Sequence, residues 1–202
     1  MESIVRIKGY HTCKTDGGIH HIWKNAPFIS EPNNRQWLTQ GYYFWTDNCH
    51  FAHKWGENSI KGEYAIIECL IEIEKNLLLD LVGSVDDQLR FEELINIFKQ
   101  RFIKTKSPET PTVSEVLAFY RRQVERTNNK DIFPYKAIKA QDKYHKSEFA
   151  FIKNSKPSYL PLVTRQQLCL FDFAVDCIKN KNIIHPESFK KDSLLFKGEK
   201  NE

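Results

Sequence analysis

Four large aromatic side chains, Tyr42-Tyr43-Phe44-Trp45, follow Gly41 without interruption. Aromatic residues favour strands, and successive side chains of a strand point to opposite faces. The run therefore predicts a compact strand over residues 42–46 that presents two large rings to each face. Both faces must be covered, by the protein's own core or by a bound molecule, because large apolar patches are rarely left exposed.

The apolar patterns on either side of this run predict an α+β fold. Residues 63–74 are the strongest strand, because their later half alternates apolar and acidic side chains. Pro108 and Pro111 are expected to separate two amphipathic helices over 86–103 and 113–126. The further elements expected are strands over 4–11, 135–139, 149–152 and 168–171, and helices over 19–24 and 48–55. We expect one domain over 1–188 with a helical insertion at about 86–130, followed by a charged, frayed tail over 189–202.

Composition excludes several classes of protein. Of the 202 residues, 41% are hydrophobic and 28% are charged, which are values typical of a globular protein. Neither a membrane-spanning apolar window nor a signal peptide is expected, so a cytoplasmic protein is predicted. The five cysteines are predicted to be buried thiols, since their number is odd and no C-x-x-C pair occurs. Cys49, His50 and His53 have helical spacing and are candidate metal ligands, but without a distant second ligand pair we predict no metal.

Charge is distributed unevenly along the chain. Residues 99–156 contain 14 Lys or Arg and 6 Asp or Glu, a balance of +8 within a net charge of +4. This middle region therefore faces either an anionic partner such as nucleic acid or plain solvent. Among these residues, Phe98, Phe102, Phe119 and Tyr120 either stack on bases or belong to a helical core stripe. The predicted phosphate-binding residues are Arg101, Lys104, Arg121, Arg122 and Arg126, with Lys106 and Lys130 nearby.

Three short motifs occur in a recognisable order. Tyr10-His11 ends the first expected strand, Gly41-Tyr42-Tyr43-Phe44 leads into Ala52, and Gln167-Leu168-Cys169-Leu170-Phe171-Asp172 follows late in the chain. This order resembles the ADP-ribosyltransferase superfamily, in the His-Tyr-Glu branch of poly(ADP-ribose) polymerases and diphtheria-type toxins. The resemblance covers about half of the chain and leaves 86–156 unmatched. It implies split antiparallel sheets with flanking helices.

The resemblance also implies NAD+ as co-substrate and a role for each matched residue. His11 would hydrogen-bond the adenosine ribose, and the backbone of Thr12, where the family usually has Gly, would hold the nicotinamide amide. Tyr43, after Gly41, would stack on the nicotinamide ring, whose positive charge suits an aromatic face. Phe51 and Lys54 would be further pocket residues. A bound dinucleotide is then one candidate to cover the second face of the aromatic strand, and core packing is the other.

The third motif departs from the family, because Gln167 stands where a glutamate is expected. Glutamine keeps an acceptor oxygen for a ribose hydroxyl, but it lacks the charge that stabilises an oxocarbenium-like transition state and cannot act as a base. This favours transfer of a single ADP-ribose over polymer synthesis. Gln166 would replace Gln167 if the strand register slipped by one residue, and Glu31 is an alternative source of a carboxylate.

These inferences predict a cytoplasmic mono-ADP-ribosyltransferase of the toxin or phage-defence type that modifies a macromolecule. RNA or DNA is favoured over protein as the acceptor, and an antitoxin or other inhibitor protein is a possible partner. One alternative is a module that binds NAD+ or ADP-ribose without transferring it. Another is an RNA-binding protein in which the aromatic strand is only core.

Overall fold

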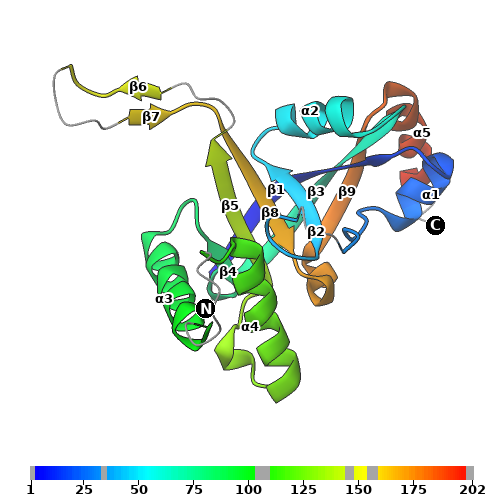
Figure 1. Ribbon diagram of the computed structural model, residues 1–202. Helices are drawn as coiled ribbons and strands as arrows, with labels where there is room; N and C mark the ends of the chain where they lie inside the picture. The colour runs from blue at the N-terminus through cyan, green and yellow to red at the C-terminus, as the bar shows by residue number, and fades with distance from the viewer. Residues whose placement is uncertain (1–2, 33–35, 103–109, 144–147, 154–158, 199–202) are drawn as a thin grey trace.

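The computed structural model describes residues 3–32, 36–102, 110–143, 148–153 and 159–198 (Figure 1). Its strands are β1 (Ile4–Lys14), β2 (Tyr42–Thr46), β3 (Tyr64–Glu74), β4 (Leu78–Asp80), β5 (Ala137–Lys143), β6 (Glu148–Ala150), β7 (Tyr159–Pro161), β8 (Thr164–Leu170) and β9 (Ile178–His185). Its α-helices are α1 (Gly18–Asn25), α2 (His50–Ser59), α3 (Val85–Phe102), α4 (Val113–Thr127) and α5 (Glu187–Gly198). Three short 3₁₀ helices are η1 (Lys75–Leu77), η2 (Lys130–Ile132) and η3 (Asp172–Cys177).

Seven strands form one sheet in the order β4-β5-β8-β2-β1-β3-β9. Every described pairing in this sheet is antiparallel except that of β4 with β5. The α+β class is therefore confirmed, whereas the two halves expected from the resemblance appear here as one continuous sheet. β6 and β7 pair only with each other and form a ribbon that stands apart from the sheet, at the upper left of Figure 1.

Helices and buried clusters cover both faces of the sheet. One face carries the larger cluster, which includes Phe44 of β2 and Leu168 of β8 and packs against α1, η3 and Phe189 of α5. The opposite face carries two clusters. The first, which includes Trp45, lies under α2, and the second, which includes Ile138 and Cys169, lies under α3 and α4. β2 contributes side chains to all three clusters, so it is packed against helices on both faces of the sheet.

Most elements agree with the sequence expectations. The strand over 42–46 and the two long helices occur as predicted, and α4 begins with a capping box between Thr112 and Glu115. β1 extends three residues beyond the expected end at His11, because Thr12, Cys13 and Lys14 continue to pair with β3. Of the five cysteines, four are buried and Cys49 is partly exposed, and all are free thiols.

The prediction of a frayed tail from residue 189 was wrong for residues 189–198, which belong to α5. Phe189 packs against the larger core cluster, and α5 contacts both β9 and α1. These contacts order a segment whose charge alone suggested solvent. No helix in the described parts of the chain has the length and apolar character needed to cross a membrane.

Candidate functional site

The three strands that carry the matched motifs, β1, β2 and β8, are direct neighbours in the sheet. β1 pairs with β2 through Tyr10 and Trp45, and β2 pairs with β8 through Trp45 and Gln167. Directly paired residues of antiparallel strands point to the same face. Tyr10, Trp45 and Gln167 therefore form a row across one face, which we call the tyrosine face. Motifs from positions 10, 43 and 167 are thus brought within two strand spacings, about 10 Å.

Tyr43 belongs to the tyrosine face, because it lies two residues before Trp45 and pairs with Cys169. Its hydroxyl donates a hydrogen bond to the carbonyl oxygen of Thr39 at 2.6 Å and accepts one from the Leu38 amide at 2.9 Å. Burial raises the pKa of the Tyr43 hydroxyl, which stays protonated at neutral pH. The loop thus fixes the phenol at its tip and leaves the ring partly exposed.

The loop that holds Tyr43 is itself strained. Thr39 is 8% exposed and adopts a left-handed backbone conformation with φ of 66°. This conformation is a genuine outlier for a β-branched residue and costs on the order of 1–3 kcal/mol. Such strain persists only where the surroundings enforce it, and here the enforcing contact is the hydrogen bond to Tyr43.

His11 lies on the opposite face, which we call the histidine face, because it is adjacent to Tyr10 in β1. Its ring is 7% exposed and packs near Phe28 and Phe44, at centroid distances of 6.3 and 6.0 Å. Nε2 accepts a hydrogen bond from the Phe28 amide at 3.1 Å, so Nδ1 carries the proton and donates to the Tyr43 carbonyl at 3.0 Å. Burial lowers the pKa of His11 to about 4, so the imidazole is neutral at pH 7.

His11 and Tyr43 are therefore brought together through the backbone, while their rings face different sides of the sheet. Both nitrogens of His11 are engaged, and the ring contacts the larger core cluster rather than the tyrosine face. The sequence expectation that both rings line one pocket does not agree with this arrangement. Instead, His11 hydrogen-bonds the backbone carbonyl of Tyr43, the residue whose ring the resemblance assigns to nicotinamide stacking.

Thr12 and Gly41 connect the site to neighbouring elements. The Thr12 hydroxyl donates to the Ala52 carbonyl of α2 at 3.0 Å, which attaches the helix to β1. A side chain at Gly41 would lie 2.5 Å from the Leu170 carbonyl oxygen and 2.6 Å from the Cys169 sulfur. Gly41 is therefore required for the close approach of the loop before β2 to β8. This packing requirement accounts for the glycine without a ligand.

Phe51 and Lys54 both lie on α2. Phe51 packs against the cluster that contains Trp45, with ring centroids 5.8 Å apart, and Lys54 is half-buried. His53 accepts or donates a hydrogen bond at Nδ1 with the Tyr64 hydroxyl, at 3.1 Å. Within the ranges that the structure describes, no group of three or more His, Cys, Asp or Glu side chains is arranged to hold a metal.

Gln167 and Gln166 face opposite sides of the sheet. Gln167 pairs with Trp45 and Ala140 on the tyrosine face, whereas Gln166 pairs with Gln141 on the other. The Gln166 oxygen Oε1 is buried and has no hydrogen-bond partner. Glu31 is exposed, and its carbonyl oxygen accepts a hydrogen bond from Gln36.

Sequence reasoning missed three residues beside Gln167. Arg165 lies two positions before Gln167, on the same face, and its guanidinium is bidentate to Asp142 of β5. The guanidinium also lies over the Trp37 ring, 4.8 Å from its centroid. The spacing of two along β8 was a usable signal for Arg165. Asp142 had none, because its place depends on the pairing of β5 with β8.

The basic residues predicted to contact nucleic acid have different environments. The Arg121 side chain is 14% exposed, donates to the Gln40 carbonyl at 2.6 Å, pairs with Asp172 and lies over the Phe171 ring. Arg121 therefore connects α4 to the loop before β2, and its assignment to phosphate binding does not agree with these contacts. Three other residues of this set are exposed, namely Arg101, Arg122 and Arg126. Lys104 and Lys106 lie outside the described residues.

Three of the predicted aromatic residues on α3 and α4 pack against the core cluster under these helices. Phe98 and Phe119 pack together at a centroid distance of 5.2 Å, and Tyr120 is buried with its hydroxyl bonded to the Leu94 carbonyl. The side chain of Phe102 is outside the described residues. The core interpretation of this stripe is therefore the correct one for these three rings.

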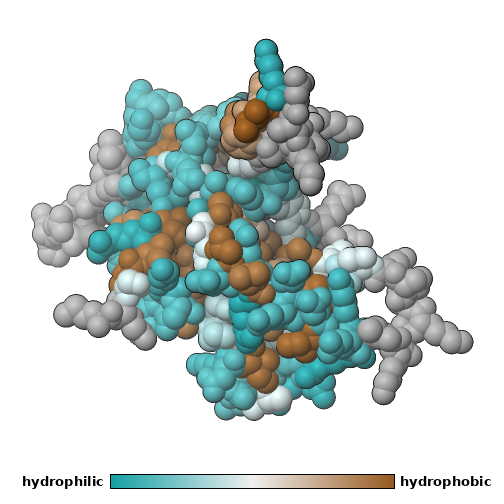
Figure 2. All heavy atoms as spheres, turned by 90° about the vertical axis from the view of Figure 1, so that its left-hand side faces the viewer, coloured by the Kyte–Doolittle hydropathy of each residue, from teal (hydrophilic) through white to brown (hydrophobic). Residues whose placement is uncertain are grey.

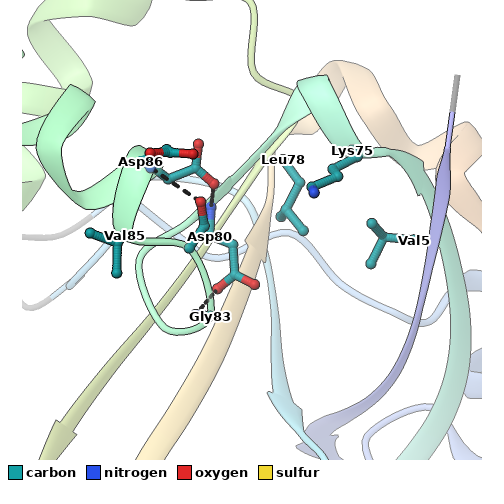
Figure 3. Close-up of a pocket in the computed structure, with 9 residues that line it drawn as sticks. Val5, Lys75, Leu78, Asp80, Gly83, Val85 and Asp86 are labelled. Atoms are coloured by element: carbon teal, nitrogen blue, oxygen red, sulfur yellow. Dashed lines mark hydrogen bonds between the residues drawn. The ribbon is translucent and has the colours of Figure 1, made fainter.

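A pocket of about 340 Å³ lies at the start of α3 (Figure 3). Its polar lining includes Lys75, Asp80, Asp86 and Asp87, and none of the predicted site residues lines it. The carboxylate of Asp80 accepts hydrogen bonds from the amides of Val82 and Gly83, and that of Asp87 accepts one from the Asp80 amide. These two carboxylates are thus explained by the turn that they close between β4 and α3.

Comparisons with protein-family models, with curated proteins and with solved structures found no match to this chain. The candidate site consequently depends on its own geometry. That geometry is the row of Tyr10, Trp45 and Gln167 on one face, with Tyr43, Trp37, Arg165 and Asp142 beside it and His11 on the opposite face.

Proposed function

We propose that this protein is a cytoplasmic, NAD+-dependent mono-ADP-ribosyltransferase that acts on a macromolecular acceptor, with RNA or DNA favoured over protein. The observation that carries the proposal is the pairing of Tyr10, Trp45 and Gln167 across three neighbouring strands. Motifs that lie far apart in the sequence thereby meet on one face, where Tyr10 and Trp45 are buried and Tyr43 and Gln167 are partly exposed.

The side chains on the tyrosine face suit a dinucleotide with a cationic ring at one end. Tyr43 and Trp37, which are both partly exposed, supply aromatic surface for the cationic nicotinamide ring. Arg165 provides a positive charge on the same face for the pyrophosphate. To bind it, the Arg165 guanidinium would redirect one or more of its hydrogen bonds from Asp142 to the phosphate oxygens. These residues fit NAD+ as co-substrate.

Each polar residue then has a restricted task. Gln167 accepts a hydrogen bond from a ribose hydroxyl and orients the sugar, but it removes no proton. His11 is a positioning residue, because its neutral ring holds the Tyr43 carbonyl and the Phe28 amide. Because Gln167 cannot remove a proton, an acceptor that is already nucleophilic and a single transfer are favoured. The bond from ribose to nicotinamide breaks, a bond from ribose to the acceptor forms, and the acceptor's proton passes to water.

Nicotinamide release from NAD+ tests the proposal, with and without a mixture of RNA, DNA and protein acceptors. Gln167→Ala and Tyr43→Ala should each reduce release at least tenfold. Gln166→Ala is the matched control for Gln167→Ala, because it removes the adjacent amide from the other face and deletes an oxygen that has no partner. Equal rates in the Gln166 and Gln167 variants would show that the tyrosine face is not the site.

An NAD+-binding module without transfer is the second candidate, and the glutamine at position 167 favours it. Such a module would show NAD+-dependent protection against thermal unfolding that Tyr43→Ala abolishes, with no nicotinamide released. Gln167→Glu separates the two candidates further. In a transferase it should preserve or raise the rate of release, because the added charge stabilises the developing cation.

A further inference from the structure

The β6–β7 ribbon forms an arm that extends from the two strands next to the candidate site. β5 leads into it and β8 leads out of it, yet β6 and β7 pair only with each other (Figure 1). Phe149 of β6 pairs with Leu160 of β7, so these two side chains share a face of the ribbon.

Large apolar side chains on the arm are exposed to an unusual degree. Phe149 is 59%, Phe151 is 64% and Ile152 is 67% exposed, and Leu160 and Leu162 are also exposed. In Figure 2, which faces the tip of the arm, apolar atoms lie on its surface near the top of the view. A concentration of this kind on a segment with no core of its own marks an interaction site.

Charge identifies the class of partner. The exposed Lys143 and Lys153 flank the apolar side chains of β6 along the chain. Protein interfaces are depleted in lysine at their apolar centre. Exposed aromatic rings next to lysines instead match a single-stranded nucleic acid, whose bases stack on the rings and whose phosphates attract the ammonium groups.

We infer that the arm binds single-stranded RNA or DNA and presents it to the tyrosine face as the acceptor. This inference rests on the proposed function. Leu160 precedes Gln167 by seven residues, which is at most about 23 Å along an extended strand. A strand of a few nucleotides held on Phe149 and Phe151 therefore reaches the neighbourhood of Gln167 by following β7 and β8.

Fluorescence anisotropy with a labelled 20-nucleotide oligo(U) or oligo(dT) tests the arm directly. The double variant Phe149→Ala/Phe151→Ala should bind at least tenfold more weakly than wild type, because each stacked ring contributes about 1–3 kcal/mol per base. Lys153→Gln should lower the salt dependence of binding. Phe173→Ala is the matched control, since Phe173 is 62% exposed on η3, outside the arm.

Two readouts keep this inference separable from the proposed function. Nicotinamide release in the absence of any acceptor should be the same in the arm variant and in wild type, whereas transfer to the oligonucleotide should fall with binding. Equal oligonucleotide affinity in the arm and Phe173 variants overturns the inference, as does arm-dependent transfer to protein but not to the oligonucleotide. Arm-dependent binding with no nicotinamide release by any variant supports the arm and refutes the transferase.

Discussion

His11 should make the stability of the protein depend on pH in a way that its replacement removes. The pKa of a histidine in an unfolded chain is about 6.5, and burial lowers that of His11 to about 4 in the folded state. Between pH 6.5 and pH 4, His11 therefore binds a proton in the unfolded state but not in the folded state. Stability is fully present above pH 6.5 and is lost as the pH falls toward 4.

The magnitude follows from the two pKa values. A gap of about 2.5 pH units at about 1.36 kcal/mol each gives a full loss of about 3 kcal/mol below pH 4. At pH 5 the unfolded chain is almost fully protonated at this site and the folded chain is not. His11 alone should therefore make the free energy of unfolding about 2 kcal/mol lower at pH 5 than at pH 7.5.

Urea denaturation at pH 7.5 and at pH 5 measures the effect when wild type is compared with His11→Gln. Subtracting the two pH differences cancels the other titrating groups, and the remainder should be about 2 kcal/mol. His50→Gln serves as the control for replacing an exposed histidine with glutamine. Parallel pH dependence in wild type and His11→Gln would refute the buried, neutral imidazole and its bonds to Tyr43 and Phe28.

Three other substitutions, with Arg122→Ala as a control, test individual contacts by urea denaturation. Gly41→Ala should destabilise the protein by about 1–3 kcal/mol, because the new methyl group meets the backbone oxygen of Leu170 at 2.5 Å. Arg121→Ala should cost about 2 kcal/mol and leave the salt dependence of oligonucleotide binding unchanged, whereas Arg122→Ala should change stability by less than about 0.5 kcal/mol. Thr112→Ala should cost about 1 kcal/mol through the loss of the capping box of α4, and an unchanged midpoint would exclude that contribution.

The sequence predicted those elements whose local pattern and tertiary role agree. The aromatic run over 42–46 and the alternating run over 63–74 form inner strands of the sheet, because their side chains pack against helices on both faces. β9 was missed, since its sequence mixes Lys179, Asn180 and Lys181 with isoleucines and matches no simple period. Its place at the edge of the sheet comes from pairing with β3, which is a long-range contact. Propensity alone does not contain such information.

The candidate site shows the same division. The three motifs lie on neighbouring strands, but motif order said nothing about which way each side chain points. Register decided that question, because Gln167 pairs with Trp45 while His11 follows Tyr10 by one residue. Asp142 and Arg165 could be paired only after β5 and β8 were known to be adjacent. Charge counting likewise found the basic middle of the chain but not that Arg121 is bound to Asp172.

The placement of His11 behind the sheet bears on how the proposed site is held together. The bond from Nδ1 to the Tyr43 carbonyl fixes the backbone of β2 from one face. On the other face, the Tyr43 hydroxyl is fixed because it donates to the Thr39 carbonyl and accepts from the Leu38 amide. A ring that is constrained at its backbone and at its tip loses little conformational entropy when a planar ligand stacks on it. His11 can therefore matter for NAD+ binding without touching the dinucleotide. Its replacement would then weaken binding by loosening Tyr43, and the nicotinamide contact itself would remain.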